Sequence, residues 1–118
     1  MPIVHIKGNP IDDQRQLEGA MVALAASLST AVGCRPESVW CTFTSFAAAT
    51  VGPAVPRRED RIVYADLLMR PRGSDTAARA LEATASTISR ALEIPLENVW
   101  VRLSELTSGS IFAGGELM

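Results

Sequence analysis

The sequence carries one pattern twice, and this internal duplication limits the folds that the chain can adopt. The segment 3–6 (IVHI) returns as 62–65 (IVYA), and 37–40 (ESVW) returns as 97–100 (ENVW). Short runs of β-branched and aromatic residues are typical of strands. Each repeat is therefore expected to begin with one strand and to end with another.

An amphipathic helix is predicted between the two strands of each repeat. In both copies the apolar positions follow one another at intervals of four, three and four residues: Leu17, Met21, Leu24, Leu28 and Leu81, Ala85, Ile88, Leu92. Asp12 or Asp13 is expected to cap the first helix and Ser74 the second, because their oxygens can accept from first-turn amides. Gly33 and Pro95 mark the helix exits.

A helix that joins two parallel strands makes a right-handed crossover, so two repeats predict an α+β (α/β) fold of β-α-β-β-α-β order. We expect a four-stranded sheet with both helices on one face. The chain is expected to form one domain, 1–118, in which the linker 53–60 joins the repeats 1–52 and 61–118. A chain of this size would leave the other sheet face bare, which predicts oligomerisation.

Composition argues against several classes of function. With 11 Lys and Arg against 13 Asp and Glu, the net charge is −2, so we expect no nucleic-acid partner and no membrane partner. The apolar runs are too short to cross a bilayer and no secretory signal is visible, which favours a cytoplasmic location. Cys34 and Cys41 are expected to stay reduced. A single histidine, His5, and the absence of a closely spaced cysteine pair predict no metal and no cofactor.

Three motifs together resemble a known family. They are Met-Pro-Ile-Val at 1–4, Glu-Asn-Val-Trp at 97–100 and Gly-Gly-Glu-Leu at 114–117. In this order they resemble the tautomerase superfamily of 4-oxalocrotonate tautomerase. Two fused units resemble its trimeric branches, those of cis-3-chloroacrylic acid dehalogenase and malonate semialdehyde decarboxylase. The resemblance implies a tautomerase β-α-β fold with a short C-terminal hairpin, and a homotrimer.

The resemblance implies an isomerase whose catalytic group is Pro2, exposed as a secondary amine once Met1 is removed. A free α-amino group has a pKa of about 7.7–8.0, and an apolar pocket or nearby arginines lower that value by disfavouring the ammonium. Neutral Pro2 would be a general base that moves a proton in an enol or dienol carboxylate, and protonated Pro2 a general acid. Taken alone, Pro2 could simply be the first residue of a strand.

Arg70 and Arg72, similar to the paired arginines of the decarboxylase branch, are the expected carboxylate-binding pair. Guanidinium groups bind carboxylates through two parallel hydrogen bonds. If the first and third strands pair antiparallel, this pair lies beside Pro2. Arg102 is a further expected substrate contact. At the other end of the sheet, Arg61 and the loop 7–10 lack both a free amine and an arginine pair, so we expect one active site per chain.

The remaining assignments are weaker and follow the family pattern. Ile111 and Phe112 are expected to form an apolar pocket wall, or else to pack between subunits. Trp40 and Trp100 are expected to pack in the core or at an interface. Glu37 lies within about one position of an acidic residue of the decarboxylase branch.

Three alternatives to a tautomerase remain open. The first is a decarboxylase of a small three-carbon acid, for which Glu37 would be the acidic residue. A hydratase or dehalogenase would need a group that activates water. In the family this is a helix histidine and a C-terminal glutamate, whose positions fall near Leu28 or Ser29 and near Ala113, and neither residue is present there. The third alternative is a non-enzymatic, ferredoxin-like module that binds a small ligand, because that fold has the same order of elements.

Overall fold

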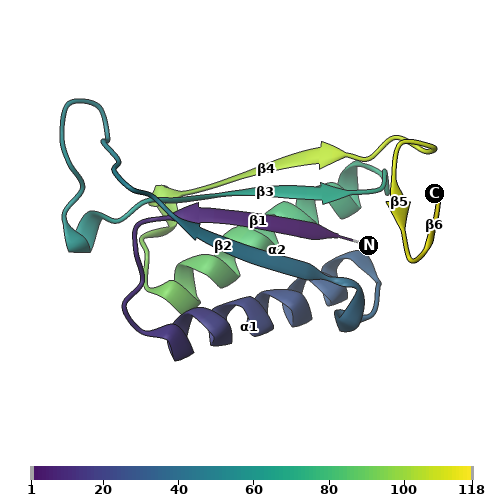
Figure 1. The fold of residues 1–118 in the computed structure, drawn as a ribbon, viewed down its shortest axis with the longest axis horizontal. Helices are drawn as coiled ribbons and strands as arrows, with labels where there is room; N and C mark the ends of the chain where they lie inside the picture. The colour runs from purple at the N-terminus through teal and green to yellow at the C-terminus, as the bar shows by residue number, and fades with distance from the viewer. Residues whose placement is uncertain (1, 118) are drawn as a thin grey trace.

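The computed structural model describes residues 2–117, which form a four-stranded sheet with two helices on one of its faces (Figure 1). The elements are β1 (Ile3–Gly8), α1 (Gln14–Val32), β2 (Trp40–Ser45), β3 (Val63–Met69), α2 (Ser74–Leu92), β4 (Val99–Glu105) and a small hairpin of β5 (Phe112–Ala113) and β6 (Glu116–Leu117). The predicted order of elements, the sheet and the C-terminal hairpin are confirmed. Across 2–117, neither helix combines the length and the hydropathy that a bilayer span requires.

The strand order β2-β1-β3-β4 places the two repeats side by side. Within each repeat the strands are parallel neighbours, β1 with β2 and β3 with β4. The repeats meet at an antiparallel pair, β1 with β3, in which Ile3 lies opposite Leu68 and Gly8 opposite Val63. A ferredoxin-like fold would insert another strand between the two strands of each unit. That alternative is therefore wrong at the level of topology.

The core fills the space between the sheet and the helices. Alternate residues of the central strands point into it, and the first helix adds the predicted Leu17, Leu24 and Leu28. In α2 the buried face is rotated from the prediction, because the buried positions include Ala80 and Thr84 rather than the half-buried Leu81 and Ala85. The Thr84 hydroxyl donates to the Ala80 carbonyl at 2.8 Å, which satisfies it inside the core.

The helix ends show which capping predictions hold. An Asp13 carboxylate oxygen accepts from the amides of Arg15 (2.9 Å) and Gln16 (3.2 Å), and Gly33 ends α1 at φ 76°. The prediction for Ser74 is wrong. Ser74 is already helical, and the cap position belongs to Gly73, whose φ of 86° lets the chain turn from the strand side into α2.

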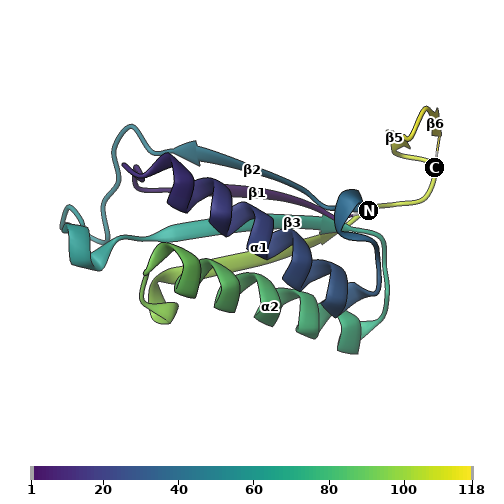
Figure 2. The ribbon, with the colours of Figure 1, turned by 90° about the horizontal axis from the view of Figure 1, so that it is seen from below.

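The sheet face without helices carries large aromatic side chains. Trp40 is 61% exposed, Tyr64 43% and Trp100 77%. Figures 1 and 2 show both helices on the same side of the sheet, and in Figure 1 no other element covers the opposite side. The expectation that a single chain leaves one sheet face bare is confirmed.

Candidate active site

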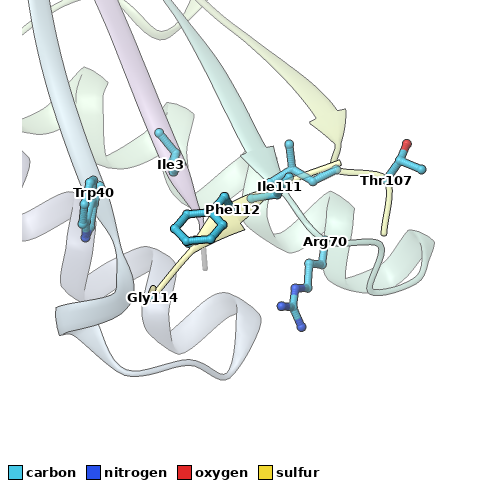
Figure 3. A pocket seen from close by; sticks show the side chains of 9 residues that line it. Ile3, Trp40, Arg70, Thr107, Ile111, Phe112 and Gly114 are labelled. Carbon is cyan, nitrogen blue, oxygen red and sulfur yellow. The ribbon is translucent and has the colours of Figure 1, made fainter. Parts of the chain in front are cut away.

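A cavity of about 230 Å³ lies at the edge of the sheet where β1 and β2 begin and β3 ends. The C-terminal segment closes it on one side (Figure 3). The residues that line it are Ile3, Trp40, Arg70, Leu106, Thr107, Ile111, Phe112, Ala113 and Gly114. Four separate stretches of the sequence thus meet here, from both repeats.

Pro2 is not among the residues that line this cavity, although it directly precedes Ile3, which does line it. Its ring is fully buried, and its carbonyl accepts a hydrogen bond from the Trp40 amide at 3.1 Å. Strand alternation places Pro2 on the helix side with Val4, whereas the next residue, Ile3, lines the cavity. Met1, whose removal the sequence hypothesis requires, lies outside the described residues.

Arg70 is the only charged residue that lines the cavity within the part of the chain that the structure describes. The antiparallel register brings the end of β3 to the start of β1, as the sequence predicted for the arginine pair. In Figure 3 the Arg70 side chain leaves the chain on the opposite side of Phe112 from Trp40. The cavity therefore combines one cation with a mostly apolar wall.

Arg72 and Arg102, the other arginines expected at the site, point elsewhere. Arg72 donates to the Val32 carbonyl at 3.4 Å, at the end of α1, where a positive charge is favourable. Arg102 lies on the bare sheet face and pairs with Asp66 at 2.9 Å. Neither side chain lines the cavity of this chain, so their roles as substrate contacts stay a prediction.

Glu37 lies in a short 3-10 helix, Pro36–Ser38, ahead of β2. Its side chain is 77% exposed, 3.8 Å from Arg35. Among the residues of 2–117 that line the cavity there is no carboxylate. The placement therefore gives no support to Glu37 as a reacting acid.

The C-terminal segment supplies the apolar wall that the sequence suggested, together with further lining residues. Ile111 and Phe112 both line the cavity, and Leu106, Thr107 and Gly114 join them. Sequence reasoning missed Trp40 and Ile3 as lining residues. A signal was present, because in a parallel crossover unit both strands begin at the same sheet edge, which sets Trp40 opposite Ile3. Neither Trp40 nor Trp100 is in the core of the single chain.

The opposite end of the sheet holds a second, polar cavity of about 350 Å³. The loop 7–10 has no arginine pair, as the sequence analysis noted, but the linker adds Arg57 and Arg58 to a lining that also includes Arg61. Three carboxylates, from Asp12, Asp13 and Glu93, share this cavity and balance those charges. The Arg61 guanidinium donates to the Leu92 carbonyl at 3.1 Å, which indicates a structural role.

Both cysteines are free, as expected, and burial raises the pKa of the Cys41 thiol to about 11. Only the thiolate is nucleophilic. In a Cys34→Ser variant we therefore expect the rate of Cys41 alkylation by iodoacetamide to rise about tenfold per pH unit from pH 7 to 10. When the same variant is unfolded in guanidinium, the alkylation rate should stop rising above the ordinary pKa of a cysteine thiol, about 8.5. A plateau at that pH in the folded protein would contradict the burial argument.

Comparison with known proteins places this geometry in a structural context. No family model matches the chain, and no curated protein does. The fold is similar to that of Pt0534 inactivated by 2-oxo-3-pentynoate, with a TM-score of 0.87 and 13% identity over 98% of this chain and 94% of that one. It is also similar to a fused 4-OT symmetric trimer (TM-score 0.85, 15% identity, 98% and 94%). Malonate semialdehyde decarboxylase matches as well (TM-score 0.75, 15% identity, 95% and 90%). The resemblance noted from the sequence motifs is confirmed at the level of the fold.

Proposed function

Because the chain has the tandem β-α-β fold of the tautomerase superfamily, we propose that it is a cofactor-independent tautomerase acting on an enol or dienol carboxylate. The observation that carries the proposal is one cavity, at the start of β1, that is lined by Arg70, by an apolar wall and by Ile3, the residue that follows Pro2. Removal of Met1 would turn the Pro2 nitrogen from an amide into a secondary amine. That amine is the general base.

The surroundings of Pro2 suit a neutral amine. Its ring is buried, its carbonyl accepts a hydrogen bond from the Trp40 amide, and Ile111 and Phe112 line the cavity at the same end of β1. Apolar surroundings disfavour an ammonium and lower its pKa. At neutral pH the amine would take the hydroxyl proton of the dienol. The electron pair of the broken O–H bond forms the carbonyl, the double bonds shift, and a distal carbon receives the proton back from the prolinium.

Arg70 is assigned the substrate carboxylate, because a guanidinium is a specific partner for that group. Binding there would also stabilise the negative charge that spreads over the dienolate during proton transfer. Arg72 is assigned a positioning role, since its hydrogen bond to Val32 ties the segment after β3 to the end of α1. This segment carries Arg70.

Substitution of the two arginines separates these roles. Arg70→Ala is expected to lower kcat/KM about 10- to 100-fold, mostly by raising KM, because a charged hydrogen bond contributes about 1.5–3 kcal/mol. Arg72→Ala is expected to change KM about twofold or less and to lower Tm instead. Steady-state kinetics and thermal unfolding of both variants make the comparison. Equal kinetic losses in the two, or none in Arg70→Ala, would remove Arg70 from its assigned role.

Two measurements test the function itself. Intact mass spectrometry determines whether the mature chain has lost Met1. An ultraviolet assay with 2-hydroxydienoates and enol pyruvates then measures ketonisation. Met1 loss together with turnover supports the tautomerase. A chain that retains Met1 and turns over none of these substrates supports a non-catalytic, ligand-binding protein.

The bare sheet face supports a second part of the proposal, a homotrimer. Exposed apolar residues are typical of protein interfaces. On this face Tyr64 and Trp100 are neighbours at one end of the sheet and Trp40 lies at the other end. The structurally similar fused 4-OT is a symmetric trimer. Phe112 and Leu117 of the hairpin, 72% and 68% exposed, would also gain cover from a neighbouring copy.

A further inference from the structure

The polar cavity of about 350 Å³ lies at the opposite end of the sheet from the candidate active site. Its volume is within the range of small-molecule pockets, about 300–1,000 Å³. The lining comes from the start of α1, the residue after α2 and the connection that leads into β3. Both helices cover the sheet face opposite to Trp40 and Trp100, so a copy docked on the bare face lies on the other side of the sheet from these helix ends (Figures 1 and 2).

Asn9 and Asp13, on the connection from β1 to α1, line this cavity and are fixed by hydrogen bonds to the backbone. Asn9 Oδ1 accepts from the Ile62 amide at 2.8 Å, and one Asp13 oxygen caps α1. A side-chain amide keeps two N–H donors when its oxygen is engaged, and a carboxylate keeps its second oxygen. This wall therefore holds both donor and acceptor groups in fixed positions.

Gln16 and Arg61, which also line the cavity, are fixed at the end of α2. Gln16 Nε2 donates to the Ala91 carbonyl at 3.2 Å, and Arg61 Nη2 donates to the Leu92 carbonyl at 3.1 Å. The Arg61 Nε is buried and has no hydrogen-bond partner within 2–117, so the chain itself does not meet the hydrogen-bonding capacity of this group. Side chains that are fixed before binding lose little further freedom when a ligand arrives.

The charged groups around the polar cavity are separated by sign. The cations come from the connection ahead of β3, and the carboxylates from the ends of the two helices. These residues are Arg57, Arg58, Arg61, Asp12, Asp13 and Glu93. In the described part of the chain, no guanidinium of this set lies within 4.0 Å of a carboxylate, and the carboxylates do not gather as metal ligands. Because the two signs balance, the cavity has no net charge that would favour a simple anion or a simple cation.

We infer that the polar cavity binds a small zwitterion of the amino acid class. Arg61 is assigned to its carboxylate, since a guanidinium group makes strong, charge-assisted hydrogen bonds with that group. Asp12 and Glu93 are assigned to its ammonium, because their side chains take no part in the cap of α1. The inference goes beyond the proposed function and depends neither on Pro2 nor on any reaction at the other end of the sheet.

Four probes with the same number of carbon atoms test the inference. Two carry both charges, 2-aminopentanoate at short and 5-aminopentanoate at long separation, and two carry one charge each, pentanoate and pentylammonium. Two-dimensional NMR of the full-length, ¹⁵N-labelled protein locates the binding, because the Gln16 and Ile62 amides bond to side chains of this cavity, whereas Ile3 lines the other one. One of the zwitterions is expected to bind at least about tenfold more tightly than either singly charged probe.

Substitutions test the two ends of the ligand separately. Arg61→Gln is expected to weaken binding of the zwitterion at least about tenfold. Glu93→Asn removes a carboxylate, suits the positive φ of 55° at this position and should weaken binding about threefold or more. Circular dichroism checks the fold of Arg61→Gln, and Arg58→Gln, at an exposed linker residue, repeats the test with an expected loss of about threefold. Arg79→Gln, which removes an exposed cation of α2 outside the cavity lining, is the control and should leave the affinity unchanged.

Three results would overturn the inference. Pentanoate that binds at the Gln16 and Ile62 amides as tightly as the zwitterions would make this a simple anion site. An absence of shifts at these amides with about 50 mM of either zwitterion would exclude the site. Zwitterion binding that stays unchanged in both Arg61→Gln and Arg58→Gln would remove the arginines from their assigned role.

Discussion

Replacement of Pro2 by alanine is expected to lower kcat/KM by about 10²–10⁴, the usual contribution of a positioned general base. The variant keeps an N-terminal amine after Met1 is removed, but it lacks the ring that is buried against the sheet and fixes the direction of the nitrogen. The loss should appear mainly in kcat, because Arg70 still binds the carboxylate. Stopped-flow measurement of ketonisation, with intact mass to confirm processing, gives the result.

A matched variant tests whether the loss of any proline would lower the activity. Pro10→Ala removes an exposed proline at the opposite end of the sheet and should retain wild-type kinetics. The pH profile adds a second check. If neutral Pro2 is the base, kcat/KM falls as pH drops through the pKa of the amine, and in Pro2→Ala this limb moves to the pKa of the new N-terminal amine. A pKa clearly above 7 would contradict a general base at neutral pH.

Replacement of Trp100 by glutamate is expected to dissociate the assembly into single chains at micromolar concentration. Trp100 lies on the bare sheet face, 77% exposed, next to Tyr64. A carboxylate buried there without a partner would cost several kcal/mol at each interface. Sedimentation velocity of wild type and variant gives the masses directly.

Val22→Glu provides the comparison for the Trp100 variant, since it adds the same charge to the outer surface of α1. It should remain associated. A wild-type protein that sediments as a monomer would refute the homotrimer. Persistence of the full assembly in Trp100→Glu would place the interface on another surface.

The fold was predictable because the repeat carries it in local patterns. Strand-like runs and a 4-3-4 helical spacing occur twice, and the rule for parallel crossovers then leaves few arrangements. The buried face of the second helix was harder to predict. The small residues Ala80 and Thr84 are buried where the spacing favoured Leu81 and Ala85.

The site was only partly predictable, because the direction of a side chain after a strand depends on the following turn. Arg70 and Arg72 are two residues apart, and strand alternation would put them on one side. The strand ends at Met69, however, and Gly73 adopts a left-handed conformation before α2. Arg72 consequently reaches the end of α1, while Arg70 stays at the cavity. The approach of Arg57 and Arg58 to Arg61 also depends on the path of a long connection, which no local pattern specifies.

The burial of Pro2 on the helix side of the sheet has a consequence for the order of events during synthesis. Pro2 directly precedes β1, an inner strand flanked by β2 and β3, so its surroundings are complete only after residues 63–69 have been made. A chain emerges from the ribosome with its N-terminus first. An aminopeptidase that removed Met1, as the proposed function requires, would therefore meet an unfolded segment for a limited period, which would end when β3 pairs with β1. Faster folding of the C-terminal repeat would leave more chains with a blocked, inactive Pro2.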